Sequence, residues 1–251
     1  MRASPPLQRT LLGLGMLLGC ASDPVNTLAP GYQGAPGLER FIVCAPNTVI
    51  ALPAEFQSAT GPLREQIDAY LRFHDRKAQW LDLLECKQQW TQAISAAKEH
   101  GPIERTPAFF AEQLDARYDF DAIVMPSLLV HAVRASKGYA WWDGVQRHMR
   151  SVNVPDEVSG FSRQQLNWLA DSGPSGDIVV TSFHVIVFSR GGERIFEGRG
   201  GIDFVSELDL SSFRHNRAIE MRVRDDLPGD VDALREAIAV GFTPFLKPPE
   251  E

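Results

Sequence analysis

After its first 20 residues the sequence has no apolar run long enough to cross a bilayer. A membrane-spanning helix needs about 20 consecutive apolar residues, and no segment between residues 21 and 251 approaches that length. The sequence also lacks the His-Glu-x-x-His motif of zinc hydrolases, the Gly-x-Ser-x-Gly motif of serine hydrolases and the ligand spacing of EF-hands. No linear motif names a reaction, and we expect neither a metal nor a cofactor.

Cysteine is scarce, with three residues in the chain: Cys20, Cys44 and Cys86. In an oxidising compartment Cys44 and Cys86 could form a disulfide. Closing a loop of this length would stabilise the fold by roughly 4 kcal/mol. Both residues also sit among apolar neighbours, where buried thiols are common. The sequence therefore leaves open whether Cys44 and Cys86 form a disulfide or remain free thiols.

Positive charge is also in short supply, since the formal net charge is −7. An acidic protein does not suit nucleic acid, and it does not suit an anionic membrane surface either. Hydrophobic residues make up 44% and charged residues 23% of the chain, which is ordinary for a folded domain with a packed core. We therefore expect one folded domain and no nucleic-acid partner.

The amino terminus has the layout of a secretory signal. Arg2 and Arg9 form a basic region, residues 11–18 are mostly apolar, and Gly19 precedes Cys20. The stretch Leu-Leu-Gly-Cys at 17–20 resembles the lipobox of bacterial lipoproteins. That resemblance implies cleavage before Cys20, a diacylglycerol on its thiol and an acyl chain such as palmitate on its amino group. An ordinary secretory signal followed by a chance cysteine is the alternative.

The lipobox resemblance also implies a location. Ala21 follows the lipidated cysteine, and in enteric bacteria the absence of aspartate at this position favours the outer membrane over the inner one. We expect the protein on the periplasmic side of the outer membrane. The expected organisation is a signal peptide at 1–19, the lipidated Cys20 with a flexible tether to 38, one α/β domain at 39–246 and a disordered tail at 247–251. The proline- and glycine-rich composition of 21–38 favours the tether.

The first half of this domain alternates between strand and helix patterns. Short β-branched runs at 41–45 and 48–52 end at prolines, as strands do. A helix is predicted from Gly61, because Leu63, Ile67 and Leu71 share one stripe. A short strand at 78–83 and helices at 84–98 and 108–118 follow.

The second half is dominated by long strands. Residues 121–133 and 178–188 read as strands, and Gly191-Gly192 supplies a hairpin turn before a return strand from Arg194. Glycines at 198–201 suggest a bulge or a bend before residues 202–205. A long polar excursion spans about 145–176, with a short helix at 163–169. Asp230 caps a closing helix. The predicted fold is α/β (α+β): a mixed sheet with alternating strands and helices first, then a long-stranded meander and a C-terminal helix.

This order of elements loosely resembles the periplasmic α/β domains of three groups. They are the curli secretion lipoprotein, the penicillin-binding-protein activator lipoproteins and the amino-terminal domain of the Tol translocation protein. The resemblance rests on three features. They are residues 49–53 before the first predicted helix, residues 118–124 at the start of the central strand, and the hairpin at 190–194. The resemblance implies an assembly or partner-binding role rather than catalysis.

Single residues give few chemical leads. Ser95 and Lys98 match Ser-x-x-Lys, but the Ser-Asp-Asn and Lys-Thr-Gly partners of that chemistry are absent. His131 and His184 lie in predicted central strands and could meet on the sheet. Structural histidines are expected there rather than a shared metal. The aspartates at 225, 226, 230 and 232 are interpreted as a solvated loop and a helix cap.

The strongest surface candidate is the aromatic stretch before Asp143-Gly144. Aromatic side chains at a turn make rigid anchors for a partner. We predict a partner-binding site there, formed by Tyr139, Trp141, Trp142, Arg147 and Arg150, although a cap over the core would explain the same aromatics.

Taken together, the sequence favours a membrane-anchored lipoprotein that acts as a binding or assembly module in the cell envelope, with another envelope protein or a second copy as its partner. One alternative is a periplasmic hydrolase acting on envelope carbohydrate. A homo-oligomeric secretion or trafficking component is the other.

Overall fold

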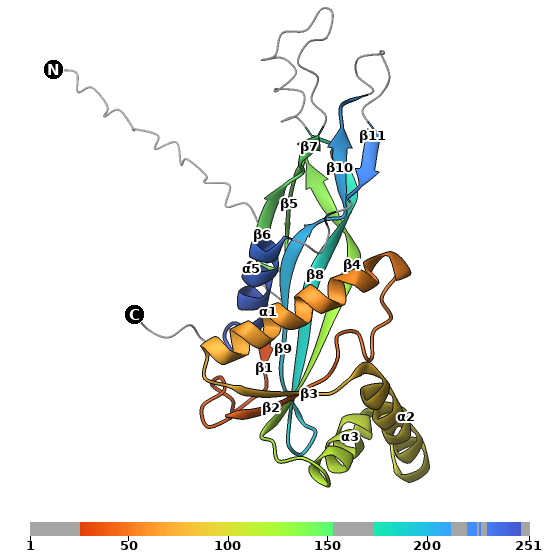
Figure 1. The fold of residues 1–251 in the computed structure, drawn as a ribbon, viewed down its shortest axis with the longest axis vertical. Helices are drawn as coiled ribbons and strands as arrows, with labels where there is room; N and C mark the ends of the chain where they lie inside the picture. Colours follow the sequence, from red (N-terminus) through yellow and green to blue (C-terminus); the bar gives the residue numbers. More distant parts are fainter. Residues whose placement is uncertain (1–25, 153–172, 212–219, 225, 227–229, 247–251) are drawn as a thin grey trace, which may run out of the picture.

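The computed structural model describes residues 26–152, 173–211, 220–224, 226 and 230–246. Its main sheet has the strand order β1-β9-β8-β4-β2-β3, with the hairpin β5–β6 joined to the end of β4. A smaller sheet has the order β11-β10-β7. Helices and strands are mixed along the chain, with a C-terminal helix, so the predicted fold class is confirmed. The molecule is elongated, with the helices toward one end and short strands at the other (Figure 1).

The first half of the chain builds a parallel unit. Strand β2 pairs in parallel with both β3 and β4, and helical crossovers connect these strands. The elements of this half are β2 (Arg40–Val43), η1 (Ala54–Ala59), α1 (Thr60–Phe73), β3 (Lys77–Trp80), α2 (Leu83–His100), η2 (Ile103–Arg105) and α3 (Thr106–Asp115).

Two long antiparallel ladders form the centre of the sheet. Strand β4 (Ala122–Ser136) pairs with β8 (Gly176–Ser189) from Ala122↔Ser189 to Ala135↔Gly176. Strand β9 (Arg194–Phe204) returns along β8 after the predicted turn, which the backbone bond from Ser189 N–H to Glu193 C=O closes. Together β4 and β8 connect the helical end to the other end of the molecule (Figure 1).

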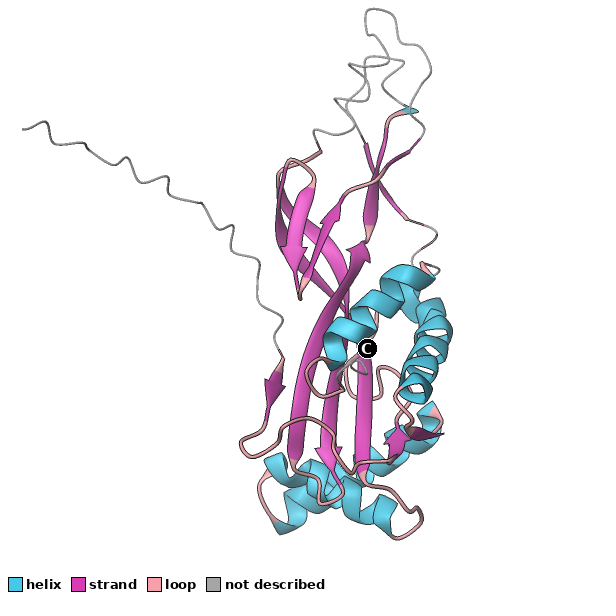
Figure 2. Ribbon diagram, turned by 90° about the vertical axis from the view of Figure 1, so that its left-hand side faces the viewer, coloured by secondary structure: helices cyan, strands magenta, loops and turns pink. Residues whose placement is uncertain are grey.

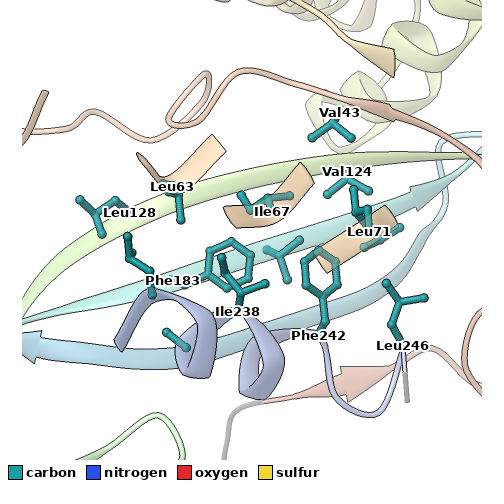
Figure 3. Close-up of a cluster of buried hydrophobic side chains, with 14 of the residues drawn as sticks. Val43, Leu63, Ile67, Leu71, Val124, Leu128, Phe183, Ile238, Phe242 and Leu246 are labelled. Atoms are coloured by element: carbon teal, nitrogen blue, oxygen red, sulfur yellow. The ribbon is translucent and has the colours of Figure 1, made fainter. Parts of the chain in front are cut away.

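One face of this sheet packs against α1 and α5 (Val231–Phe242). As predicted, Leu63, Ile67 and Leu71 form the inner stripe of α1, and all three are fully buried. They meet Phe183 of β8 and Phe242 of α5 in the core drawn in Figure 3. Burying a side chain of this size stabilises the fold by about 1.5–3 kcal/mol, so this layer is the main apolar core.

The opposite face packs against α2 and α3 at the helical end of the molecule (Figure 2). Because successive side chains of β2 point to opposite faces of the sheet, Phe41 and Val43 pack on the side of α1, and Ile42 packs on the side of α3. The aromatic rings of Trp90 and Phe110 meet edge to face across α2 and α3, with centroids 5.2 Å apart. Near β2 the sheet is therefore covered on both sides, which explains why its residues 41–43 are all apolar.

The glycines of β9 allow helix α5 to approach the sheet closely. A Cβ at Gly198 would collide with the carbonyl oxygen of Gly241, and one at Gly200 would collide with that of Ala237. We predicted a bulge at 198–201, but these residues keep a regular register with β8. The register shift lies beyond Gly201. Helix packing, not bulging, accounts for these glycines.

Beyond the helices, the long strands continue into a second region, which we call the extension. It contains β5 (Tyr139–Trp142), β6 (Val145–His148), β7 (Ser151–Val152), β10 (Ser206–Asp209) and β11 (Glu220–Val223), with the adjoining ends of β4, β8 and β9. Its smaller apolar cluster includes Trp142, Val180 and Phe204. We call the remainder of the described chain, with its helices, the body.

Three details differ from the sequence predictions. Residues 26–38 lie on the body instead of forming a flexible tether: β1 (Thr27–Leu28) pairs with β9, and the Asn26 side chain donates to Val240 C=O at 2.8 Å. Residues 48–52 form a loop, because the Asn47 side chain holds this segment to Leu128 of β4. The predicted excursion at 145–176 begins with β6 and β7.

Other predicted features fall outside the described residues, namely the signal peptide, Cys20, the helix at 163–169 and the tail at 247–251. Across the described ranges, no helix combines the length and the hydrophobicity needed to span a bilayer. Asp230 caps α5 as predicted, with its carboxylate accepting the N–H of Ala233 at 3.1 Å.

Candidate functional site

The candidate site is built on the β5–β6 hairpin. Strand β5 pairs with β6 in the register Tyr139↔His148 to Trp142↔Val145. The turn residues Asp143 and Gly144 have φ angles of 43° and 79°. Two positive φ values are what a tight two-residue hairpin requires, and Asp-Gly is a favoured sequence for it. The predicted turn signal therefore fixes which side chains share a face.

Two adjacent tryptophans point to opposite sides of this hairpin. Trp142 is 3% exposed, its indole N–H donates to Thr181 C=O at 3.2 Å, and its ring centroid lies 5.4 Å from that of Phe204. We predicted Trp142 as a partner contact, but its side chain is part of the extension core. It anchors the hairpin to the sheet.

The other side of the hairpin presents aromatic rings to solvent. Tyr139 is 41% and Trp141 45% exposed, and their ring centroids lie 6.5 Å apart. The ring of His148 on β6 is 4.3 Å from that of Tyr139. We call Tyr139, Trp141 and His148 the aromatic face. Half-exposed rings held on paired strands lose little conformational freedom when they bind.

The two arginines predicted beside these aromatics make contacts within the protein. Arg147 donates to Ile202 C=O at 3.0 Å and to the carboxylate of Glu236 on α5 at 2.7 Å. Arg150 donates to Asp226 at 3.1 Å and lies 3.6 Å from Asp203. They tie the hairpin side of the extension to α5 and to β9, so they do not stand as free cations for an anionic partner.

A buried ion cluster supports the same region. Arg224 is 4% exposed and pairs with Asp203, and its Nε donates to Asp226 at 2.8 Å. Burial raises the pKa of Asp203 above its usual value. Sequence reasoning interpreted Asp226 only as part of a solvated loop, because its partner Arg150 is 76 residues away along the chain.

Beneath the hairpin turn lies a second polar group, made of Asp143, His131 and Ser182. The His131 Nε2 atom is 2.9 Å from Ser182 Oγ and 3.5 Å from Asp143 Oδ2. A nucleophilic triad needs serine and aspartate on opposite ring nitrogens, whereas here both approach Nε2. Ser182 is also fully buried, so its hydroxyl is not placed to attack a substrate.

His184 of β8 forms a separate group with Glu197 and Arg199 of the neighbouring strand β9. Its Nε2 lies 3.1 Å from Glu197 Oε1, and burial lowers the pKa of His184 below its usual value. The pairing His131↔Val180 and Ser127↔His184 separates the two histidines by four residues along the ladder, which is roughly 13 Å. The sheet does not bring them to a common metal.

No three or more His, Cys, Asp or Glu side chains of the described residues are arranged to hold a metal ion. The Ser95 hydroxyl makes a contact within its own helix. It donates a hydrogen bond to Thr91 C=O, one turn earlier in α2, at 3.1 Å.

Cys44 and Cys86 meet in the apolar layer between the sheet and α2. Both are fully buried free thiols in this structure. A hydrogen bond between them, together with burial, raises the pKa of the Cys44 thiol well above its usual value. Both cysteines are free here, and their proximity means that oxidation can test whether they also form the possible disulfide.

The chain matches no protein-family model, and no curated protein or solved structure is detectably similar to it. The candidate site therefore has to be judged on its own geometry.

Proposed function

We propose that this protein is a lipid-anchored module of the bacterial cell envelope that binds another envelope protein through its aromatic face. The observation that carries the proposal is the opposite orientation of Trp141 and Trp142. Trp142 fixes the hairpin from inside the extension, and Trp141 remains 45% exposed on the outside beside Tyr139. A rigid hairpin that exposes two large aromatic side chains has the composition of a binding hot spot.

The chemistry of the face favours a protein partner with an apolar segment. The neighbouring Arg147 and Arg150 are already paired with carboxylates, so an anionic ligand finds little free positive charge there. Aromatic rings with a polar edge, as in Tyr139 and Trp141, suit a partner whose apolar side chains pack on the rings. The hydrolase alternative gains no support from Ser182, which is fully buried.

Lipid anchoring supplies the membrane part of this proposal. The lipobox at 17–20 places the expected lipid a few residues before Asn26, where the described chain joins the body. The Cys20→Ser variant tests it directly: we expect the protein to be lost from the outer-membrane fraction. Retention of the variant in the outer-membrane fraction would contradict a lipid anchor on Cys20.

A photocrosslinking amino acid at position 141 tests the partner-binding part in the native envelope. Phe73 on α1 is the matched control position, because it is an aromatic residue 66% exposed on the body. We expect a discrete crosslinked protein from position 141 that is absent from position 73. Identical products from both positions would argue against a binding site on the hairpin, and a product containing only this chain would favour the homo-oligomer alternative.

The identified partner is then titrated in purified form. Trp141→Ala should weaken binding by about 2 kcal/mol, roughly 30-fold, as truncation of a tryptophan hot spot does. Phe73→Ala should bind like the parent. Equal affinities of the two variants for the partner would mean that the aromatic face is not part of the interface.

A further inference from the structure

A second candidate site lies on the body, away from the hairpin. A cavity of about 410 Å³ opens where the chain leaves β2 and β3 and enters α1 and α2. Its volume lies within the range of small-molecule pockets, about 300–1,000 Å³. Both strands are parallel and end at the same edge, and ligands of open α/β sheets bind at the carboxyl ends of such strands.

One wall of the cavity is held in place by the neighbouring strand. Asn47 is 8% exposed, accepts the N–H of Leu128 at 3.0 Å and donates to the C=O of the same residue at 2.9 Å. The Thr48 hydroxyl closes the turn by donating to Ala45 C=O at 2.7 Å. These bonds attach the β2–α1 loop to β4, so a ligand would not have to order the wall.

The cavity carries an excess of positive charge. Arg64 of α1 and Lys87 of α2 line it, and within the described part of the chain neither lies within ion-pair distance of a carboxylate. The guanidinium of Arg64 is 4.9 Å from the ring centroid of Trp80, which restricts its position. Asp82 also lines the cavity, but its carboxylate accepts the N–H of Glu85 at 2.7 Å as the cap of α2. The two cations therefore remain available to a ligand.

Apolar side chains complete the lining. Leu52 and Leu83 border the cavity, and Leu83 is 42% exposed. A ligand that fits both halves has an anionic group and a compact apolar portion.

We propose that this cavity binds a small soluble organic anion, a phosphate or carboxylate that carries a compact apolar group. Arg64 and Lys87 hold the anionic group, and Leu52 and Leu83 contact the apolar portion. A phospholipid headgroup has similar chemistry. However, β1, which follows the expected lipid anchor, and β3, beside the cavity, form opposite edges of the sheet. The cavity therefore does not lie on the side where the chain would meet its membrane.

Calorimetric titration of the full chain carrying Cys20→Ser tests this proposal with phenyl phosphate as the probe. Inorganic phosphate and benzyl alcohol serve as the charged and the apolar half of that probe. We expect phenyl phosphate to bind at least about tenfold more tightly than either half. Arg64→Gln and Lys87→Gln should each weaken it about tenfold, since each removes a charge-assisted contact.

Arg72→Gln and Lys98→Gln are matched controls on the same two helices and should leave the affinity unchanged. Arg72 already pairs with Asp68 at 2.8 Å. Nuclear magnetic resonance of the Trp80 indole N–H locates the ligand, because the Arg64 guanidinium lies over that ring. A shift of this signal on titration supports the assignment.

Three outcomes would overturn the proposal. One is phenyl phosphate binding that survives in the Arg64→Gln, Lys87→Gln double variant. Another is equal affinity for phenyl phosphate and benzyl alcohol. In the third, the parent protein does not bind phenyl phosphate. It binds phosphatidylglycerol vesicles more tightly than phosphatidylcholine vesicles, and this preference depends on the same two residues. That result would mean that the ligand is a lipid headgroup.

Discussion

The body and the extension share the strands β4, β8 and β9 but are stabilised in different ways. In the body, helices cover both faces of the sheet near β2, and the apolar clusters around Phe183 and Phe110 contain many fully buried side chains. The extension has a smaller apolar cluster around Trp142 and a buried ion cluster around Arg224. The body therefore has the larger apolar core, whereas the extension depends on a small cluster and on buried charges. Single substitutions in each should distinguish the two regions.

The largest effect should come from the body core. Phe242→Ala removes a ring that lies 5.4 Å from Tyr70 and 5.6 Å from Phe183 between α5 and the sheet. The expected loss in the free energy of unfolding is about 3–5 kcal/mol. Urea denaturation followed by circular dichroism measures it, with the exposed Phe73→Ala as control. A midpoint close to that of the parent would mean that the body core does not govern global stability.

Trp142→Ala should weaken the extension without unfolding the body. The variant loses the buried ring and leaves Thr181 C=O without its indole donor, which we expect to cost about 3 kcal/mol. Hydrogen exchange should show lost protection over residues 139–148 and unchanged protection in α1. Trp141→Ala, on the exposed side, should change stability by less than about 0.5 kcal/mol. Equal effects of both substitutions would contradict the orientation of the hairpin.

The ion cluster of the extension should be the next most sensitive. Arg224→Met leaves the buried Asp203 without its closest cation, although Arg150 remains at 3.6 Å. We expect a loss of about 2 kcal/mol. Adding Asp203→Leu should recover part of it, because an apolar pair replaces a buried charge. A double variant less stable than Arg224→Met would show that Asp203 has a role beyond this ion pair.

The smallest effect concerns the edge of the body and depends on pH. The Arg40 guanidinium, at 2.9 Å, lowers the pKa of Asp121 to about 2. The carboxylate therefore contributes stability fully above its unfolded pKa of about 4, and this contribution is lost as the pH falls toward 2. Asp121→Asn should be less stable than the parent at pH 6 and should converge with it near pH 2. Parallel stability curves between pH 6 and 2 would contradict this linkage.

Features that depend on neighbours in sequence could be predicted. Asp230 as the cap of α5, the Asp143-Gly144 turn and the stripe of Leu63, Ile67 and Leu71 all follow from side-chain chemistry within a few residues. The alternation of β5 also fixes the opposite orientations of Trp141 and Trp142. Which of the two would face inward depends on where the hairpin folds back on β8, and that contact is not local.

Features that depend on distant partners could not be predicted. Residues 48–52 have the composition of a strand, but Asn47 attaches them to β4 81 residues further along the chain. Gly198 and Gly200 indicated a bulge because nothing local reveals that α5 would pack against them. The cations of the cavity, Arg64 and Lys87, lie on separate helices and line the same cavity because β2 and β3 are parallel neighbours.

The continuous β4–β8 ladder has a mechanical consequence. It runs from Ala122↔Ser189 in the body to Ala135↔Gly176 beside the hairpin, a distance of roughly 45 Å. A load applied at the hairpin and resisted by the body acts along the strands, so the bonds of this ladder share it in shear instead of opening one after another. A small rotation of the body becomes a larger sweep of the hairpin tip. The two paired strands work as a stiff lever between the helices of the body and the hairpin of the extension.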